Sequence, residues 1–166
     1  MIKLLVLDVD GCLTDGKIIY SSDGVESKNF NVKDGLAITS WIRLGGQVAI
    51  ITGRNSNIVE RRANELGIQH LFQGVKDKGT VLQELVESLG IKPYEIAAIG
   101  DDFNDYEMLH FVGRSFTPND APKDIQDLVD VVLSRKGGDG AVREMIDMII
   151  EQNDQKEQFL SLWIKG

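Results

Sequence analysis

Short apolar runs alternate with amphipathic stretches along most of this chain. Residues 4–7 form a continuous apolar run, which is typical of a strand covered on both faces of a parallel sheet. The pattern predicts further strands at 48–51, 70–72, 95–99, around Ser115 and at 129–133. It predicts helices at 36–44, from Asn55 or Ser56 to 66, at 79–89, at 105–111, after 117–122 and at 141–150. Strands that alternate with helices indicate βαβ units, so we expect an α/β fold, a Rossmann-like three-layer sandwich with a mainly parallel sheet.

Two strand-like runs stand outside this alternation. Residues 17–20 and 25–30 flank Ser21-Ser22-Asp23-Gly24, and Asp-Gly between two such runs is a strong hairpin signal. An isolated two-stranded hairpin is only marginally stable, so its apolar residues need a partner surface. That surface could belong to the body of the same chain or to another copy. After the hairpin, Asp34 is expected to cap the helix that Gly45 and Gly46 end.

Polar residues suited to catalysis follow three of the predicted strands. Asp8 and Asp10 follow the first, Thr52 follows the second, and Asp101 and Asp102 follow the fourth. In open α/β sheets the carboxyl ends of the strands form the binding edge, so these side chains should gather there. Two further residues belong to the same edge: Lys78 at the start of a helix, and Asp105 one turn after Asp101.

Carboxylates that lie close together need a cation or a shared proton, and either has a chemical use. Asp101, a carboxylate of the first loop and a backbone carbonyl suit Mg²⁺. Asp8 could then attack phosphorus, with Asp10 as the general acid and base and with Thr52 and Lys78 offsetting the charge of the phosphoryl group. Residue by residue, simpler readings stay open: Asp-x-Asp-Gly could be a plain turn, Thr52 and Asp105 could be helix caps, and Lys78 could be a solvated lysine.

Composition narrows the classes of function. A chain of 166 residues is expected to be one domain, and a net charge of −8 argues against a nucleic-acid binder. The single Cys12 excludes an internal disulfide and fits a reducing compartment. No apolar run reaches the length of a membrane span, and no signal-peptide pattern opens the sequence. We therefore expect a cytoplasmic protein with no membrane partner.

Four motifs, taken together, resemble those of the haloacid dehalogenase superfamily of phosphohydrolases. They are Asp8-Val-Asp10-Gly-Cys-Leu-Thr14, Thr52-Gly-Arg54, Lys78 and Gly100-Asp101-Asp102-x-x-Asp105. The resemblance implies that Asp8 is the nucleophile and Asp10 the general acid and base. It implies Mg²⁺ held by the Asp8 carboxylate, the Asp10 carbonyl and Asp101, with Thr52 and Lys78 on the phosphoryl group. Asp102 and Asp105 would hold the residues of the metal site, or Lys78, in position.

Members of this superfamily select substrates with a cap domain, for which this chain has no room. The interval 15–46 holds only a hairpin and a helix, and the interval 52–78 holds one helix and one strand. Neither interval could hold a separate domain of about 50 residues. We therefore expect a capless protein, 1–166 as a single haloacid dehalogenase-like hydrolase domain, with a protruding hairpin at about 17–30 and a tail at about 152–166.

A narrower resemblance is to the 3-deoxy-D-manno-octulosonate 8-phosphate phosphatases. It is carried by Phe30-Asn-Val-Lys-Asp-Gly35, Ile51-Thr-Gly-Arg54, Gln73-Gly74 with Lys78, and Gly137-Gly-Asp-Gly-Ala-Val-Arg-Glu144. It implies hydrolysis of that sugar phosphate for lipopolysaccharide synthesis. The substrate contacts that it implies are Asn31, Val32, Lys33, Asp34, Gly35, Arg54, Arg62 and Lys78. It also implies a homotetramer, in which hairpins form a central barrel and the C-terminal segment of one subunit covers its neighbour's site.

Two other functions stay open. A related branch acts on nine-carbon sialic-type 9-phosphates and often has an acid near Arg54, so Arg54 favours the eight-carbon substrate. Thr39 departs from the family pattern, where arginine is frequent, and this puts one substrate contact in question. The alternative from a different class is a non-catalytic oligomeric module, against which the four intact motifs argue.

Overall fold

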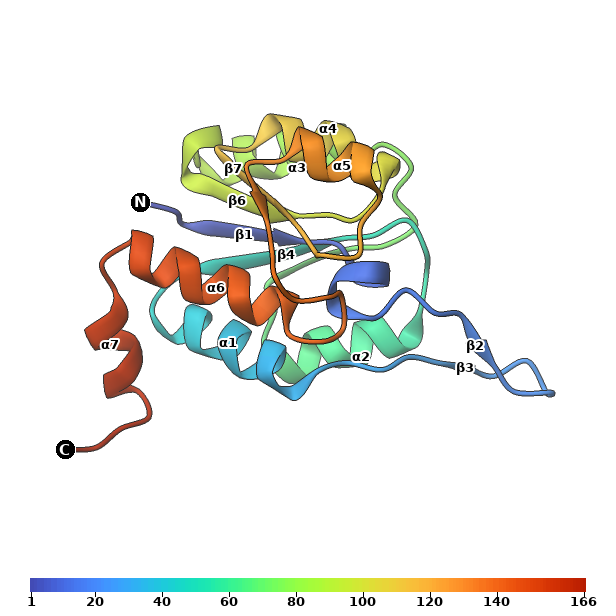
Figure 1. Ribbon diagram of the computed structural model, residues 1–166, viewed down its shortest axis with the longest axis horizontal. Coiled ribbons are helices and arrows are strands. Elements are labelled where there is room, and N and C mark those ends of the chain that lie inside the picture. The colour runs from blue at the N-terminus through green and yellow to red at the C-terminus, as the bar shows by residue number, and fades with distance from the viewer.

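A six-stranded parallel sheet forms the centre of the computed structural model, which describes residues 1–166 (Figure 1). Its strands are β1 (Leu4–Leu7), β4 (Gln47–Ile51), β5 (His70–Phe72), β6 (Ile96–Ile99), β7 (Arg114–Thr117) and β8 (Val131–Val132). They lie in the order β5-β4-β1-β6-β7-β8, and each neighbouring pair is parallel. The predicted α/β fold with a parallel sheet is therefore confirmed.

Helices cover both faces of the sheet (Figure 1). The helices α1 (Val32–Arg43), α2 (Asn57–Leu66) and α6 (Ala141–Gln152) lie on one face, and α3 (Lys78–Leu89), α4 (Tyr106–Phe111) and α5 (Lys123–Leu128) lie on the other. Three short helical turns complete the body: η1 (Val9–Leu13), η2 (Pro93–Glu95) and η3 (Phe103–Asp105). None of these helices has both the length and the apolar character needed to cross a membrane.

The central strand β1 serves both layers of the core. Leu5 and Leu7 pack into the cluster under α1 and α6, whereas Leu4 and Val6 pack into the cluster under α3 and α4. All four side chains are fully buried, which is the reason for the uninterrupted apolar run in the sequence. Each contributes roughly 1.5–3 kcal/mol of hydrophobic stabilisation. The strand is thereby fixed, and the loop that follows it starts from a rigid base.

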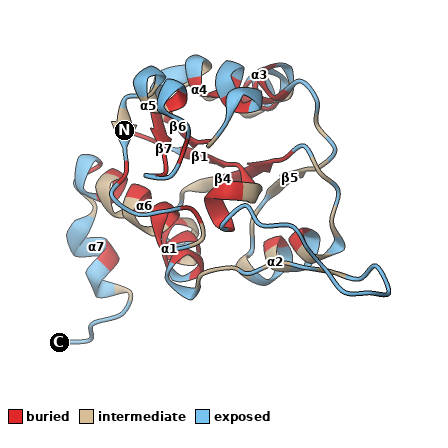
Figure 2. Cartoon of the chain, turned by 45° about the vertical axis from the view of Figure 1, so that its right-hand side comes forward, coloured by how far each residue is buried: buried red, intermediate tan, exposed pale blue.

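The hairpin is shorter than predicted. Its strands β2 (Ile19–Tyr20) and β3 (Glu26–Ser27) pair only with each other, and their residues are mostly exposed (Figure 2). Without a third strand the ladder ends after two residue pairs, so the flanking parts of 17–20 and 25–30 are irregular. Ile18, Ile19, Tyr20 and Val25 keep exposed apolar side chains.

The start of α1 corrects the expected cap. The helix begins at Val32, and the Asn31 side chain accepts a hydrogen bond from the Lys33 N–H. Asp34 lies inside the first turn, where its Oδ1 accepts from the backbone N–H of Arg143 on α6. The apolar periodicity starts only at Leu36, so it gave no signal for a polar first turn.

Other boundaries shift by a few residues. The α3 helix starts at Lys78 with Asp77 as its cap, β8 is shorter than 129–133, and α6 extends to Gln152. The tail forms a further helix, α7 (Lys156–Ser161), at the end of the molecule opposite the hairpin (Figure 1). There the Trp163 indole N–H donates to the Ser40 hydroxyl of α1 at 3.0 Å, and Arg43 lies over its ring.

Candidate active site

Three adjacent strands deliver the predicted catalytic side chains to one edge of the sheet. Asp8 follows β1, Thr52 follows β4, and Asp101 follows β6 after Gly100. Because β1 lies between β4 and β6 and is parallel to both, the three strand ends meet. Asp8 and Thr52 are almost completely buried, and Asp101 is half-buried. The sheet therefore places these residues where the sequence predicted them.

Lys78 joins two carboxylates at the centre of this edge. Its Nζ donates to Asp8 Oδ1 at 2.8 Å and to Asp105 Oδ1 at 2.6 Å, and all three side chains are buried. The second oxygen of Asp105 accepts the backbone N–H of Asp101 at 2.8 Å. Asp105 thus fixes both the lysine and the loop that carries Asp101. Of the two supporting residues that were predicted, Asp105 is the one that binds Lys78.

Asp102 has a different place. It is exposed, and its carboxylate caps η3 by accepting the Phe103 N–H at 2.8 Å. Asp102 therefore shapes the turn that brings Asp105 inward and makes no contact with Lys78.

Three carboxylates, those of Asp8, Asp101 and Asp105, lie close together here, whereas Lys78 supplies one positive charge. Burial raises the pKa of Asp8 to about 6, and the charge of Asp105 adds to this rise while Lys78 opposes it. Burial, together with the charges of Asp8 and Asp105, raises the pKa of Asp101 to about 8. Burial alone would lower the pKa of Lys78, but its two carboxylate partners outweigh burial and raise it, so the ammonium stays charged. A site with this surplus of negative charge favours an added cation.

The donor set fits a hard divalent ion. Ligand atoms of Asp8, Cys12 and Asp101 lie within 4.8 Å of one another. Burial and the charges of Asp8 and Asp101 raise the pKa of the Cys12 thiol well above its usual value, so the thiol stays protonated and is a poor ligand. The two carboxylates remain, and oxygen is the ligand that Mg²⁺ prefers. These residues therefore fit Mg²⁺ better than a thiolate-bound metal.

Gly11 allows the first loop to approach Asp101. A Cβ at position 11 would lie 1.8 Å from Asp101 Oδ2, and Gly11 has φ +90°, a conformation that side chains disfavour. The glycine of the Asp-x-Asp-Gly motif thus has a structural reason: no other residue lets η1 pack this closely against the carboxylate.

The hairpin contributes a residue that sequence reasoning missed. The Lys28 ammonium lies 2.5 Å from Asp10 Oδ1, and the lysine side chain is only 2% exposed. The sequence holds a weak signal for it, since Glu26, Lys28 and Phe30 alternate with the small polar residues Ser27 and Asn29. Two charged residues on the inward side of an isolated hairpin strand indicate a charged partner in the body.

The predicted substrate-binding residues separate into two groups. Arg54 lies beside the hairpin, and Arg62 lies over the Phe30 ring, whereas Val32 and Lys33 are exposed at the start of α1. Asp34 and Gly35 are buried and face protein groups, respectively the Arg143 N–H and the Arg62 guanidinium. Asp34 and Gly35 thus join α1 to α6 and α2, and their part in substrate binding stays a prediction. Thr39 likewise turns back, donating to the Leu36 carbonyl within α1.

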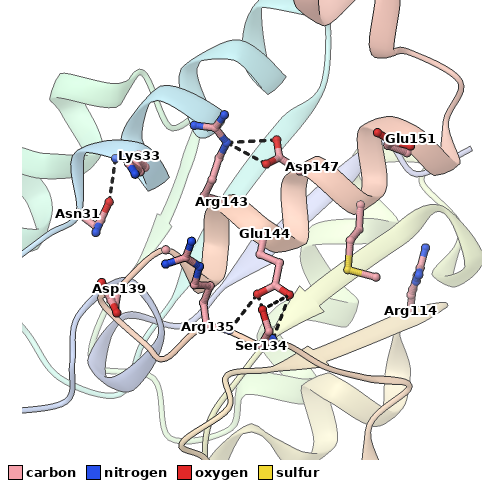
Figure 3. Close-up of a pocket in the computed structure, with 12 residues that line it drawn as sticks. Asn31, Lys33, Arg114, Ser134, Arg135, Asp139, Arg143, Glu144, Asp147 and Glu151 are labelled. Atoms are coloured by element: carbon pink, nitrogen blue, oxygen red, sulfur yellow. Dashed lines mark hydrogen bonds and ion pairs between the residues drawn. The ribbon is translucent and has the colours of Figure 1, made fainter.

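A groove of about 610 Å³ runs along α6 (Figure 3). Asn31 and Lys33 line one end of it, but the catalytic carboxylates do not line it. Much of its charge is paired internally: Arg143 binds Asp147, and Glu144 accepts from the backbone N–H groups of Ser134 and Arg135. The groove is therefore an accessory surface, not the site of the chemistry.

Asp34 leads to a test of stability against pH. Burial raises its pKa to about 6, opposed by the Arg143 N–H and by the charges of Arg62 and Arg143, and Oδ2 has no hydrogen-bond partner. Because the folded pKa exceeds the ordinary 3.8, the folded state holds the proton more tightly. The contribution of Asp34 to stability should therefore fall as the pH rises from about 4 through about 6, and Asp34→Asn should lack this contribution. The difference in unfolding free energy between the two proteins should change by up to about 3 kcal/mol. Urea unfolding at a series of pH values measures it, and a pH-independent difference would contradict the assigned environment.

The chain is similar in sequence to known hydrolases. Residues 71–146 match the family model of the haloacid dehalogenase-like hydrolases. The chain is 44% identical to the 3-deoxy-D-manno-octulosonate 8-phosphate phosphatase of Yersinia pestis over 94% of this chain and 83% of that protein. It is 41% identical to the Haemophilus influenzae enzyme of the same name, over 95% of this chain and 88% of the relative. The chain belongs to the haloacid dehalogenase-like hydrolases.

Solved structures of this hydrolase family share the whole fold. The 3-deoxy-D-manno-octulosonate 8-phosphate phosphatase of Moraxella catarrhalis, in complex with magnesium, phosphate and the sugar acid, matches with a TM-score of 0.95 and 40% identity. The match covers 98% of this chain and 94% of that one. The cobalt-bound Haemophilus influenzae protein matches with a TM-score of 0.90 and 40% identity, over 96% of each chain.

Proposed function

We propose that this protein is a Mg²⁺-dependent phosphatase that hydrolyses 3-deoxy-D-manno-octulosonate 8-phosphate to the free sugar acid and phosphate, a step in lipopolysaccharide precursor synthesis. One observation carries the reaction class: Asp8, Lys78 and Asp105 form a buried ion-paired cluster beside Asp101 at the carboxyl edge of the sheet. Two relatives above 40% identity, each named for this activity, support the substrate.

The residues at the edge divide the reaction between them. An Asp8 carboxylate oxygen attacks phosphorus and the bond from phosphorus to the sugar oxygen breaks, while Asp10 gives that oxygen a proton. Asp10 then takes a proton from water as the water oxygen attacks the aspartyl-phosphate, which releases phosphate and restores Asp8. Thr52 and Lys78 hold the phosphoryl oxygens throughout. Asp8, the Asp10 carbonyl and Asp101 would hold Mg²⁺, which when bound offsets phosphoryl charge and orients the phosphate.

Arg54 is the residue we assign to the sugar-acid carboxylate. Its Nη2 donates to the Tyr20 hydroxyl at 3.1 Å, while its Nη1 is buried without a hydrogen-bond partner. A guanidinium matches a carboxylate with two parallel hydrogen bonds, so the unpaired nitrogen is suited to an acidic sugar. The further substrate contacts that we propose are Asn31, Val32, Lys33, Asp34, Gly35 and Arg62.

Steady-state kinetics with Mg²⁺ tests the substrate. We expect kcat/KM to be highest for the eight-carbon 8-phosphate. It should exceed the values for a nine-carbon sialic-type 9-phosphate and for p-nitrophenyl phosphate by at least about 10-fold, which corresponds to one contact worth roughly 1.4 kcal/mol. A preference for the nine-carbon ester would mean that the nine-carbon ester is the substrate, while the proposed reaction class would still hold. If p-nitrophenyl phosphate is the best of the three, the sugar assignment is wrong.

We also propose a homotetramer in which the C-terminal segment of one subunit covers the site of its neighbour. The hairpin exposes Ile18, Ile19, Tyr20 and Val25, an apolar surface typical of an interface. The α7 helix and the hairpin lie at opposite ends of the molecule, so α7 does not cover the site of its own subunit (Figure 1). Light scattering tests the assembly: a fully active monomer would contradict it.

The single buried Cys12 is in keeping with the cytoplasmic location that we propose.

A further inference from the structure

The hairpin sends one charged side chain into the catalytic edge. Lys28 follows β3, and its neighbours Ser27 and Asn29 are exposed, yet its own side chain is only 2% exposed. Lysines on surface hairpins usually keep their ammonium groups in water. Here the ammonium lies 2.5 Å from Asp10 Oδ1 and 3.2 Å from Glu26 Oε1. The two carboxylates compensate for the loss of water around the ammonium, so they determine where this side chain lies.

The series of ion pairs from Asp10 through Lys28 to Glu26 continues to Arg54. Glu26 Oε1 lies 3.3 Å from Arg54 Nη2, which also donates to the Tyr20 hydroxyl. Glu26 Oε1 is buried and takes part through charge, since neither contact has the geometry of a hydrogen bond. Hairpin residues thus contact two residues of the site: Asp10 through Lys28, and Arg54 through Glu26 and Tyr20.

The contact leaves one oxygen of Asp10 for proton transfer. Lys28 donates to Oδ1, so Oδ2 is the oxygen that can carry the proton. A carboxyl group turns about its terminal bond with little resistance, and one fixed oxygen determines the position of the other. Misplacing a reacting group by about 1 Å can cost about 10²-fold in rate.

We propose that Lys28 is a positioning residue for the proton transfer at Asp10. The inference rests on the proposed function: as Asp8 forms its bond to phosphorus and the ester bond breaks, the proton on Asp10 Oδ2 moves to the departing sugar oxygen. Lys28 holds Oδ1 during this transfer and stays beside the carboxylate that results. The hairpin is therefore part of the catalytic apparatus as well as a candidate interface.

The leaving group distinguishes this role from a general one. A sugar alkoxide is a poor leaving group and needs the proton, whereas p-nitrophenolate leaves without one. We expect Lys28→Met to lower kcat/KM for the sugar phosphate, or for any alkyl phosphate that the wild type hydrolyses, by about 10²-fold. With p-nitrophenyl phosphate the loss should be no more than a few-fold. Lys28→Arg, which keeps charge and donors, should restore most of the alkyl activity.

A double-mutant cycle tests whether Lys28 acts through Asp10. In an Asp10→Asn background the further change Lys28→Met should have almost no effect, because the group that it positions is gone. Lys17→Met is the matched control, since Lys17 is an exposed hairpin lysine, and it should leave all rates unchanged. Lys28→Gln is measured in parallel, so that the result does not depend on the folding of one variant, and melting curves accompany each protein.

Three outcomes would overturn the proposal: equal losses on both substrate types, undiminished alkyl activity in Lys28→Met, or additive losses in the double variant. Equal losses would place Lys28 in phosphate binding or folding. If the wild type hydrolyses other alkyl phosphates but not the octulosonate ester, the substrate proposal fails while the role of Lys28 is still decided by the contrast between alkyl and aryl esters.

Discussion

Asp8→Asn should abolish turnover without unfolding the protein. The amide cannot attack phosphorus, and removing a nucleophile lowers kcat by at least about 10⁴-fold in comparable enzymes. The fold should persist because Lys78 keeps Asp105 as a partner at 2.6 Å. The change also removes a charge that raises the pKa of Asp101, so the site loses repulsion as well as attraction. Phosphate release and thermal melting, measured on the same preparation, give both readouts.

Asp15→Asn is the matched control for that variant. Asp15 lies on the same loop but is exposed, and its side chain only accepts the Lys17 N–H and lies near the Lys17 ammonium. This control should keep its turnover and its melting temperature. Full activity in Asp8→Asn would require another nucleophile, and loss of the fold would mean that Asp8 is a structural residue.

Lys78→Met should have the largest effect on stability. It leaves the buried carboxylates of Asp8 and Asp105 without their shared cation, and removing one partner of a buried ion pair typically costs about 3–5 kcal/mol. Turnover should be lost as well, since Lys78 is assigned to the phosphoryl group. Added Mg²⁺ should recover part of the stability, because a divalent ion would bind Asp8, one of the two carboxylates that lose their cation. Urea unfolding in chelator and in Mg²⁺ measures both effects.

Lys76→Met serves as the control, since Lys76 is an exposed lysine two residues before Lys78. It should unfold like the wild type in both buffers. If Lys78→Met is as stable as that control in chelator, the cluster does not have the energetic role given to it here.

The catalytic edge could be predicted because it depends on local rules. Asp8, Thr52 and Asp101 each follow a buried apolar run, and parallel strands bring such positions together whatever the rest of the chain does. The role of Asp105 over Asp102 could not be settled, because both lie within one turn of Asp101 and only the geometry of η3 decides which points inward.

Long-range contacts explain the rest of what the sequence could not show. The sequence predicts Asp34 as a helix cap because its actual partner, the Arg143 N–H, lies far along the chain. The sequence gives Lys28 only a weak signal, because the hydrophobic pattern does not show how a hairpin lies against the body. Both residues are charged groups on polar stretches, where periodicity carries little information.

The most direct test of the central claim is to trap the covalent intermediate. The protein is mixed with substrate and Mg²⁺, quenched during turnover, and reduced with borohydride, which converts an aspartyl-phosphate to homoserine. Peptide mass spectrometry should then find homoserine at position 8, only when both substrate and Mg²⁺ are present, and never in Asp8→Asn. Turnover that leaves position 8 unmodified, or that modifies a different residue, would contradict the assignment of Asp8 as the nucleophile.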